Sequence, residues 1–127
     1  MNWRTTIRRM CLALPETYEE RAWVGTRWRV RGRTFAHVLD ILDGTPPAFA
    51  QAAGTDGPAH ILIFRSSGIE LDALSTRHGF FAPGWGPQII GLVLDETVDR
   101  VELGELITDS YCNRAPQKLI ALLDLPE

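Results

Sequence analysis

Several features are scarce in this sequence of 127 residues, and each scarcity excludes a class of protein. Its apolar runs are only a few residues long, so no segment is predicted to cross a bilayer. The first 14 residues carry arginines but no apolar stretch with a small-residue cleavage site, which does not resemble a signal peptide. Only two cysteines, Cys11 and Cys112, are present and they lie far apart, which favours reduced thiols over a disulfide. We therefore expect a cytoplasmic protein without a membrane partner.

The chain also lacks an excess of basic residues, because its net charge is −3 at neutral pH. This value argues against indiscriminate binding to nucleic acid or to anionic lipid. The charges are unevenly distributed, since residues 1–33 hold eight arginines and three glutamates, whereas residues 34–127 hold five basic and thirteen acidic residues. The length suffices for one hydrophobic core and is too short for two. We predict a single domain over residues 1–127 with a local basic region.

Hydrophobic periodicity and capping signals predict the order of the elements. Apolar residues recur at helical spacing from Trp3 to Leu14, with Asn2 placed to cap this helix and Pro15 to end it. Later segments are predicted as a hairpin over 23–42, a strand over 59–65, a helix opened by the Ser67-x-x-Glu70 capping box, strands at 80–81 and 88–94, a helix opened by Asp99, and a short helix after Pro116. This order indicates a two-layer α+β fold, α-β(3)-α-β(2)-α, with an antiparallel five-stranded sheet and helices packed on one face.

The hairpin over residues 23–42 carries the main functional hypothesis. Gly32 and Arg33 can form a two-residue type II′ turn, which pairs Arg29 with Ala36 and Trp28 with His37. Alternation then predicts a core face and a second face. The predicted core face comprises Val24, Thr26, Trp28, Val30, Phe35, His37, Leu39 and Ile41. The second face comprises Trp23, Arg27, Arg29, Arg31, Thr34, Ala36, Val38 and Leu42.

Residues 43–58 contain three glycines and two adjacent prolines and are predicted to be a loop, long for a small domain. The strands at 59–65 and 88–94 are apolar on both faces, as in sheets covered on both sides. Helices on one face leave the other open, so this second face needs a cover. The candidates are a second subunit, a protein partner, a small ligand, or the 43–58 loop with Phe49 folded back.

Three sequence segments carry a resemblance to a known family. They are Cys11-Leu12-Ala13-Leu14-Pro15-Glu16-Thr17-Tyr18-Glu19-Glu20, Val30-Arg31-Gly32-Arg33-Thr34-Phe35-Ala36, and Leu106-Ile107-Thr108-Asp109-Ser110-Tyr111 with Arg114-Ala115-Pro116-Gln117-Lys118-Leu119. In this order they resemble the MmcQ/YjbR family over nearly the whole chain. The resemblance implies a compact fold related to the bacterial frataxin and secretion-chaperone folds. It also implies a DNA-binding role through a double-wing arrangement, no enzyme activity, and no agreed site residues. The chain departs from the family at Ile89-Ile90-Gly91-Leu92, where an aromatic residue is usual.

The candidate nucleic-acid-binding residues are Arg27, Arg29, Arg31 and Arg33, with Trp23 on the same predicted face. Guanidinium groups bind phosphate bidentately, and residues two apart on a strand are spaced by about 7 Å, near the phosphate spacing along one DNA strand. Trp23 is placed to stack on a base or on an arginine. The alternative reading is a solvated sheet face whose charges discourage edge aggregation.

The remaining polar residues do not assemble into a catalytic or metal motif. His37, His60 and His78 show no metal-ligand spacing, and His37 is predicted to be a hydrogen-bonded core histidine facing Trp28. Carboxylates such as those of Glu16, Glu19 and Glu20 suit hard cations, but three acids without further ligands are usually solvated. We therefore predict no enzyme activity, no catalytic residue, no metal and no cofactor. The expected function is binding, to DNA through the basic hairpin, or alternatively to a protein, a small ligand or a second copy of the chain through the open sheet face.

Overall fold

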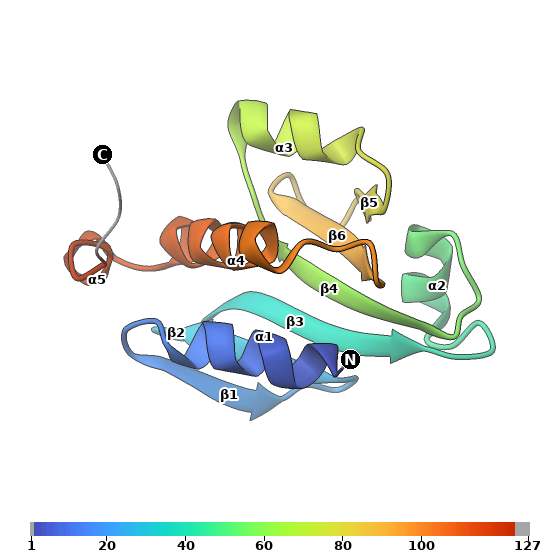
Figure 1. Cartoon of the computed structure of the whole chain (residues 1–127), viewed down its shortest axis with the longest axis horizontal. Coiled ribbons are helices and arrows are strands. Elements are labelled where there is room, and N and C mark those ends of the chain that lie inside the picture. Colours follow the sequence, from blue (N-terminus) through green and yellow to red (C-terminus); the bar gives the residue numbers. More distant parts are fainter. Residues whose placement is uncertain (1, 124–127) are drawn as a thin grey trace.

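The computed structural model describes residues 2–123, which form an α+β fold (Figure 1). The helices are α1 (Trp3–Leu12), α2 (Pro47–Ala53), α3 (Gly68–Ser75), α4 (Arg100–Arg114) and α5 (Gln117–Ile120). The strands are β1 (Thr17–Arg21), β2 (Thr26–Val30), β3 (Arg33–Ile41), β4 (Ala59–Arg65), β5 (Phe80–Phe81) and β6 (Ile89–Leu94). Two predicted caps are confirmed, since Asn2 Oδ1 accepts from the Thr5 amide and Asp99 Oδ1 accepts from the Val101 amide. Ser67 precedes α3 without a side-chain capping bond, so the predicted capping box is wrong.

The strands form one antiparallel sheet in the order β1-β2-β3-β4-β6-β5. The predicted class is confirmed, but the sheet has six strands and not five. The additional strand is β1, whose polar sequence Thr-Tyr-Glu-Glu-Arg pairs along β2 at the sheet edge. No helix among residues 2–123 is both long and apolar enough to span a membrane.

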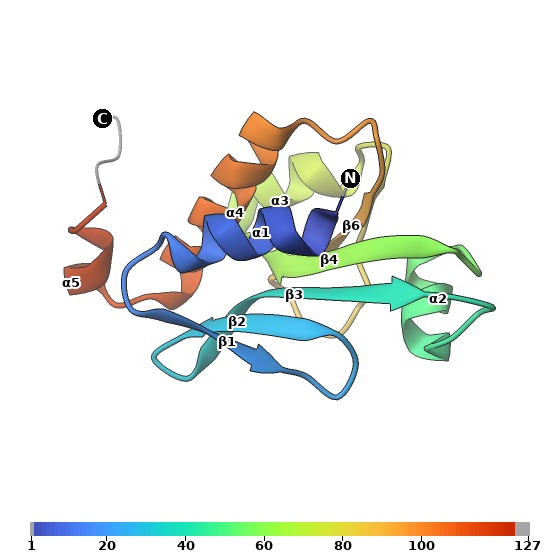
Figure 2. The same cartoon turned by 60° about the horizontal axis from the view of Figure 1, so that its bottom comes forward.

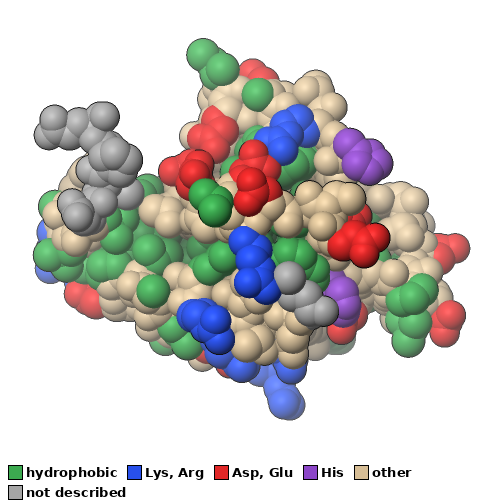
Figure 3. Space-filling model, viewed as in Figure 1, with side chains coloured by type: hydrophobic (Ala, Val, Ile, Leu, Met, Phe, Trp, Pro, Cys, Tyr) green, Lys and Arg blue, Asp and Glu red, His purple; other side chains and the backbone are tan. Residues whose placement is uncertain are grey.

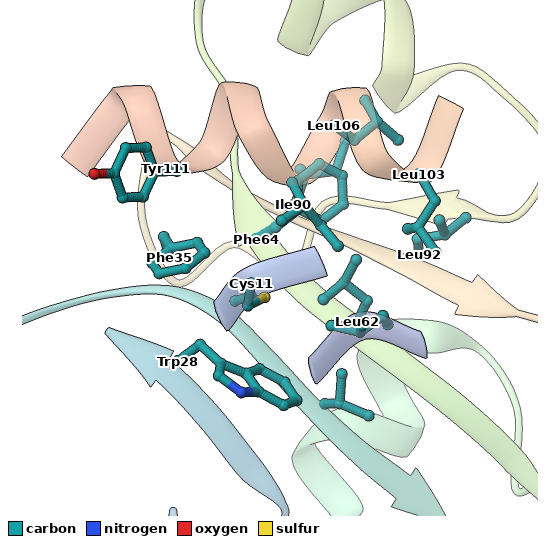
Figure 4. Packing of buried hydrophobic residues seen from close by; sticks show 14 of the residues in the cluster. Cys11, Trp28, Phe35, Leu62, Phe64, Ile90, Leu92, Leu103, Leu106 and Tyr111 are labelled. Atoms are coloured by element: carbon teal, nitrogen blue, oxygen red, sulfur yellow. The ribbon is translucent and has the colours of Figure 1, made fainter. Parts of the chain in front are cut away.

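Helices α1, α3 and α4 cover one side of the sheet, which we call the helix face (Figure 2). The main core lies here and joins Ile7 of α1 and Leu103 of α4 to Trp28 of β2 and Phe64 of β4. Figure 4 shows Phe35 and Tyr111 facing each other across this core, and their rings meet edge to face at 5.5 Å. The Tyr111 hydroxyl donates to the Pro15 carbonyl at 2.8 Å, which ties α4 to the chain leaving α1.

The opposite side of the sheet, which we call the outer face, is partly covered. Helix α2 lies within the predicted 43–58 loop and packs there, so the prediction that all helices lie on one face is wrong. A second apolar cluster forms under this helix from Leu39, Ile41, Ala50 and Ile61, with Phe49 packed against it. Of the covers proposed for this face, the folded-back segment is therefore present, and it covers the end of the sheet away from the β2–β3 turn (Figure 1).

The register of the β2–β3 hairpin differs from the prediction. The turn residues are Arg31 and Gly32, with φ of 50° and 77°, and Val30 pairs with Arg33. Two positive φ angles define a type I′ turn, one of the two turn types favoured in two-residue hairpins. The prediction placed the turn one residue later, at Gly32 and Arg33. A β-bulge then shifts the register between Trp28 and Arg29, so that Trp28 faces Ala36.

From Ala36 onward, the bulge reverses the predicted faces of β3. Ala36 and Val38 pack into the main core, whereas Leu39 and Ile41 lie on the outer face. His37 is paired with Arg27, and not with Trp28 as predicted. One additional residue in a strand changes the face of every residue after it, which explains the error.

Ser110 of α4 bridges β3 and β4 just past the point where their pairing ends, next to the β2–β3 bulge. Its buried hydroxyl donates to the Phe35 carbonyl at 2.6 Å and accepts from the Arg65 amide at 2.8 Å. Both backbone groups lie past the last paired residues, Ala36 and Phe64, and would otherwise lack a partner in the sheet.

Replacing Ser110 by alanine should therefore lower the free energy of unfolding by about 1–3 kcal/mol, because two buried backbone groups lose their partner. Urea denaturation followed by circular dichroism measures the change. Thr108→Ala on the same helix is the control, since its hydroxyl forms no hydrogen bond among residues 2–123. A loss of stability no larger than that of the control would show that water replaces the hydroxyl.

Candidate nucleic-acid interface

Alternation along β2 places two of the four hairpin arginines on the outer face. Trp28 and Val30 are fully buried on the helix face, so Arg27 and Arg29 point to the opposite side. Arg31 lies in the turn, and Arg33 begins β3 across from Val30. The four candidate arginines therefore lie along the β2–β3 hairpin, but only Arg27 and Arg29 share the outer face, because Arg33 pairs with the helix-face residue Val30.

Glu20 of β1 and Glu16, which directly precedes that strand, supply carboxylates to three of these arginines. Glu20 accepts from Arg27 Nε at 2.8 Å and also from its Nη2, and it lies 3.4 Å from Arg29 Nη1. Glu16 accepts from Arg31 at 2.9 and 3.3 Å. These hydrogen bonds hold the pKa values of both carboxyl groups below their usual range. The acidic residues Glu16 and Glu20 thus neutralise part of the hairpin, a pairing that sequence reasoning missed.

Two further arginines join this end of the sheet from distant parts of the sequence. Arg65 ends β4 beside the β3 bulge, and alternation places it on the outer face, because Ile63 belongs to the outer cluster. Arg114 ends α4. Burial, and to a lesser extent the charge of Arg114, lowers the pKa of the Arg65 guanidinium. Neither arginine has a carboxylate within 4.0 Å in the described part of the chain. The charges of Arg65 and Arg114 therefore add to those of the hairpin and are not neutralised by a carboxylate of the described residues.

The polar atoms of this region are incompletely bonded. Arg29 Nε and Arg114 Nε are buried and have no hydrogen-bond partner among residues 2–123. Arg29 also donates from Nη2 to the Gly32 carbonyl, which holds its side chain against the turn. Buried guanidinium nitrogens without an acceptor are costly unless an anionic ligand supplies one.

Two aromatic side chains stand beside the arginines. Trp23, predicted to share their surface, lies in the turn between β1 and β2 and is 101% exposed. Tyr18 of β1 lies across from Arg29 and is 40% exposed. Exposed aromatic rings next to arginines are typical of surfaces on which nucleic-acid bases stack. Tyr18 was missed because the prediction did not recognise β1 as a strand.

The opposite side of the molecule does not offer a comparable surface. Figure 3 shows the helix face, where basic side chains lie over α1 and acidic ones gather around α3 and α4. Arg8 of α1 pairs with Glu19 at 2.6 Å, and Arg77 pairs with Glu102 at 2.8 Å. Arg4 and Arg8 of α1 line a separate hollow with Trp23, on the other side of the β1–β2 turn from Arg27 and Arg29.

The histidines and cysteines lie apart from the arginines or are engaged in the fold. His37 Nε2 lies 2.6 Å from the Val24 carbonyl oxygen and donates to it, and burial lowers the pKa of the imidazole. His60 Nδ1 lies 2.6 Å from Asp40 Oδ1 at an exposed position. Cys11 and Cys112 are free, and burial raises the pKa of both thiols. Residues 2–123 contain no group of three or more His, Cys, Asp or Glu side chains placed to hold a metal ion.

The glutamate–arginine pairs predict acid sensitivity. Glu19 accepts from Arg8 and from Trp28 Nε1, and these bonds hold the pKa of its carboxyl group below its usual range. Because the folded pKa is the lower one, the stabilisation is present above the unfolded pKa and is lost as pH falls through the folded pKa.

The urea concentration at the unfolding midpoint should therefore decrease as the pH is lowered from about 5 to about 3. Glu19→Gln should flatten this dependence, while Glu105→Gln, at an exposed position on α4 without an ion pair among residues 2–123, should leave it unchanged. Equal profiles for the wild type and Glu19→Gln would contradict the assignment.

The six-stranded antiparallel sheet with helices packed on it defines an α+β protein, and its β2–β3 hairpin carries the arginines. A crystal structure of a protein from Pseudomonas syringae, solved by a structural genomics consortium, has the same fold. The two superpose with a TM-score of 0.69 at 18% identity, over 91% of this chain and 100% of that one. The sequence model of the YjbR family matches residues 12–113, so the chain belongs to the YjbR family. No curated protein matches the sequence.

Proposed function

We propose that this member of the YjbR family is a non-enzymatic DNA-binding domain of the cytoplasm. Its phosphate-binding surface is the arginine end, which we define as Arg27, Arg29, Arg31, Arg33, Arg65 and Arg114. The observation that carries the proposal is that these six arginines bond only two carboxylates among residues 2–123, those of Glu16 and Glu20. A cluster of like charges that the fold does not neutralise raises the energy of the free protein and favours a polyanionic ligand.

The geometry suits phosphate groups. Arg29 pairs with Thr34, and Ser110 bridges the Phe35 carbonyl to the Arg65 amide. Arg29 and Arg65 therefore lie on the outer face on either side of β3, separated by two strand spacings or about 10 Å. Phosphate oxygens are good acceptors for guanidinium donors, and Arg29 Nε has no acceptor among residues 2–123. The aromatic rings of Tyr18 and Trp23 add sites where bases can stack.

The test is fluorescence anisotropy of labelled random-sequence DNA titrated with the protein at about 50 and 200 mM salt. Binding that weakens steeply with salt supports the proposal, because phosphate contacts release counterions. Absence of binding by micromolar protein at the lower salt concentration to both single-stranded and duplex DNA would overturn it. A protein partner on the outer face would then be the leading hypothesis.

Glu20 should act as an internal competitor of phosphate. Glu20→Gln removes the carboxylate that Arg27 and Arg29 share, and it should tighten DNA binding several-fold, up to about tenfold, at low salt. The anisotropy titration measures this gain. Glu105→Gln makes the same change of charge on α4 and should alter affinity less than twofold, within about 0.4 kcal/mol. Equal gains in the two variants would show that only net charge matters.

A further inference from the structure

A hollow on the outer face adjoins the arginine end. It has a volume of about 560 Å³ and lies between the β1–β2 turn and the start of α2. Trp23 and Val24 form one wall, Pro47 and Phe49 form the other, and Arg27, Thr34 and His37 contribute the polar groups. This volume and this mixture of apolar walls with a few polar groups are typical of small-ligand sites.

Interactions within the fold hold both walls in place. The Phe49 ring meets His37 edge to face at 5.9 Å and Trp85 at 4.9 Å, which anchors α2. His37 also donates to the Val24 carbonyl, so one imidazole supports the two walls. Gly25 lies so close to β3 that an added Cβ would come within 2.0 Å of the Val38 carbonyl oxygen. Packing thus holds the Phe49 wall and the backbone of the β1–β2 turn, while the exposed Trp23 ring stands at the rim of the hollow.

The polar groups at the hollow retain unused donors. Arg27 binds Glu20 through Nε and Nη2, and its Nη1 forms no hydrogen bond with any described residue. The Thr34 hydroxyl is likewise unbonded among residues 2–123, and Thr34 lies across from Arg29. The hollow therefore opens directly beside the first two cations of the arginine end.

We infer that this hollow receives an unpaired base of single-stranded DNA while the adjoining phosphates lie along Arg27, Arg29 and Arg65. This inference rests on the proposed function. An extended strand spaces Arg27 and Arg29 by about 7 Å, which matches successive phosphates of one extended DNA strand. A flat, apolar base with polar edges suits walls formed by Trp23 and Phe49 and donors on Arg27 and Thr34. In a duplex the bases are stacked and paired, so duplex DNA can use the arginines but not the hollow.

The experiment compares three labelled probes by anisotropy: a random single strand, the duplex of the same sequence, and an abasic strand with the same number of phosphates. The single strand should bind at least about tenfold more tightly than either of the others, because stacking of a base adds to the phosphate contacts. Trp23→Ala should weaken single-strand binding about tenfold without changing the salt slope, and Trp23→Phe should restore most of it. Because Trp23 is 101% exposed, these variants should fold like the wild type.

The outcomes separate the two proposals. If duplex and abasic probes bind as tightly as the single strand, or if Trp23→Ala binds like the wild type, the hollow does not receive a base, while DNA binding through the arginines stands. If no probe binds, the proposed function and this inference both fail. Ile69→Ala is the control, because Ile69 is 88% exposed on α3, far from the outer face, and should leave all three affinities unchanged.

Discussion

Replacing Trp28 by alanine should lower the free energy of unfolding by about 3–5 kcal/mol. Trp28 is fully buried in the main core, where it lies beneath Cys11 of α1 (Figure 4). Its truncation leaves a large cavity between α1 and the sheet. Its Nε1 also donates to Glu19 at 3.0 Å, and Glu19 in turn accepts from Arg8 of α1. One side chain thus links the first helix to the edge hairpin that carries the arginines.

Urea unfolding followed by far-ultraviolet circular dichroism measures this loss independently of tryptophan fluorescence. Trp28→Phe should cost less than the alanine variant, because it keeps most of the volume and loses only the bond to Glu19. This variant keeps the prediction testable if the alanine variant does not fold. Trp23→Ala is the matched control and should change the free energy of unfolding by no more than about 0.5 kcal/mol, since the Trp23 side chain is exposed. Equal losses at the two tryptophans would contradict the packing described for Trp28.

All the helices described here except α2, and most strands, could be predicted because their signals are local. The apolar residues of α1 and α4 recur at helical spacing, and Asn2 and Asp99 are followed by the amides that they cap. Strand β1 has no such signal, because its side chains are mostly polar and both its faces are partly exposed. It is held by pairing with β2 and by the contacts of Glu19 and Glu20 with arginines from other elements.

The hairpin register could not be predicted, because the residue that stabilises the bulge is distant in sequence. Ser110 lies 75 residues from Phe35, the residue that the bulge leaves without a partner on β2, and its hydroxyl donates to the Phe35 carbonyl. Without that contact, a regular hairpin with a two-residue turn was the simplest prediction for the glycine at position 32. The result was that His37, Leu39 and Ile41 were placed on the wrong face.

The candidate site was predictable only in part. Every second residue of β2 is an arginine, so alternation alone placed Arg27 and Arg29 on one face. Arg65 and Arg114 reach the same region through the pairing of β3 with β4 and the packing of α4, and both are tertiary features. Their combination gives the arginine end more positive charge than the hairpin alone supplies.

The triple variant Arg29/Arg33/Arg65→Ser should nearly abolish binding of single-stranded DNA at moderate salt. If each arginine contacts one phosphate, the loss of three contacts should weaken binding about 500-fold at 50 mM salt and about 30-fold at 200 mM. The slope of log affinity against log salt concentration should become shallower by about two. The anisotropy titration used for the wild type gives both quantities.

The control variant Arg9/Arg77/Arg100→Ser removes the same number of positive charges from the helix side of the molecule. All three side chains are exposed, and only Arg77 forms an ion pair with a carboxylate in residues 2–123, that of Glu102. If the arginine end contacts phosphates directly, the control should retain most of the affinity and the wild-type salt slope. Equal losses in the two triple variants would mean that DNA responds to the overall charge of the protein, and the arginine end would then not be its binding surface. A large loss confined to Arg29, Arg33 and Arg65 would instead place the phosphate contacts at the arginine end, where Ser110 links β3 to β4 and holds Arg65 beside the hairpin.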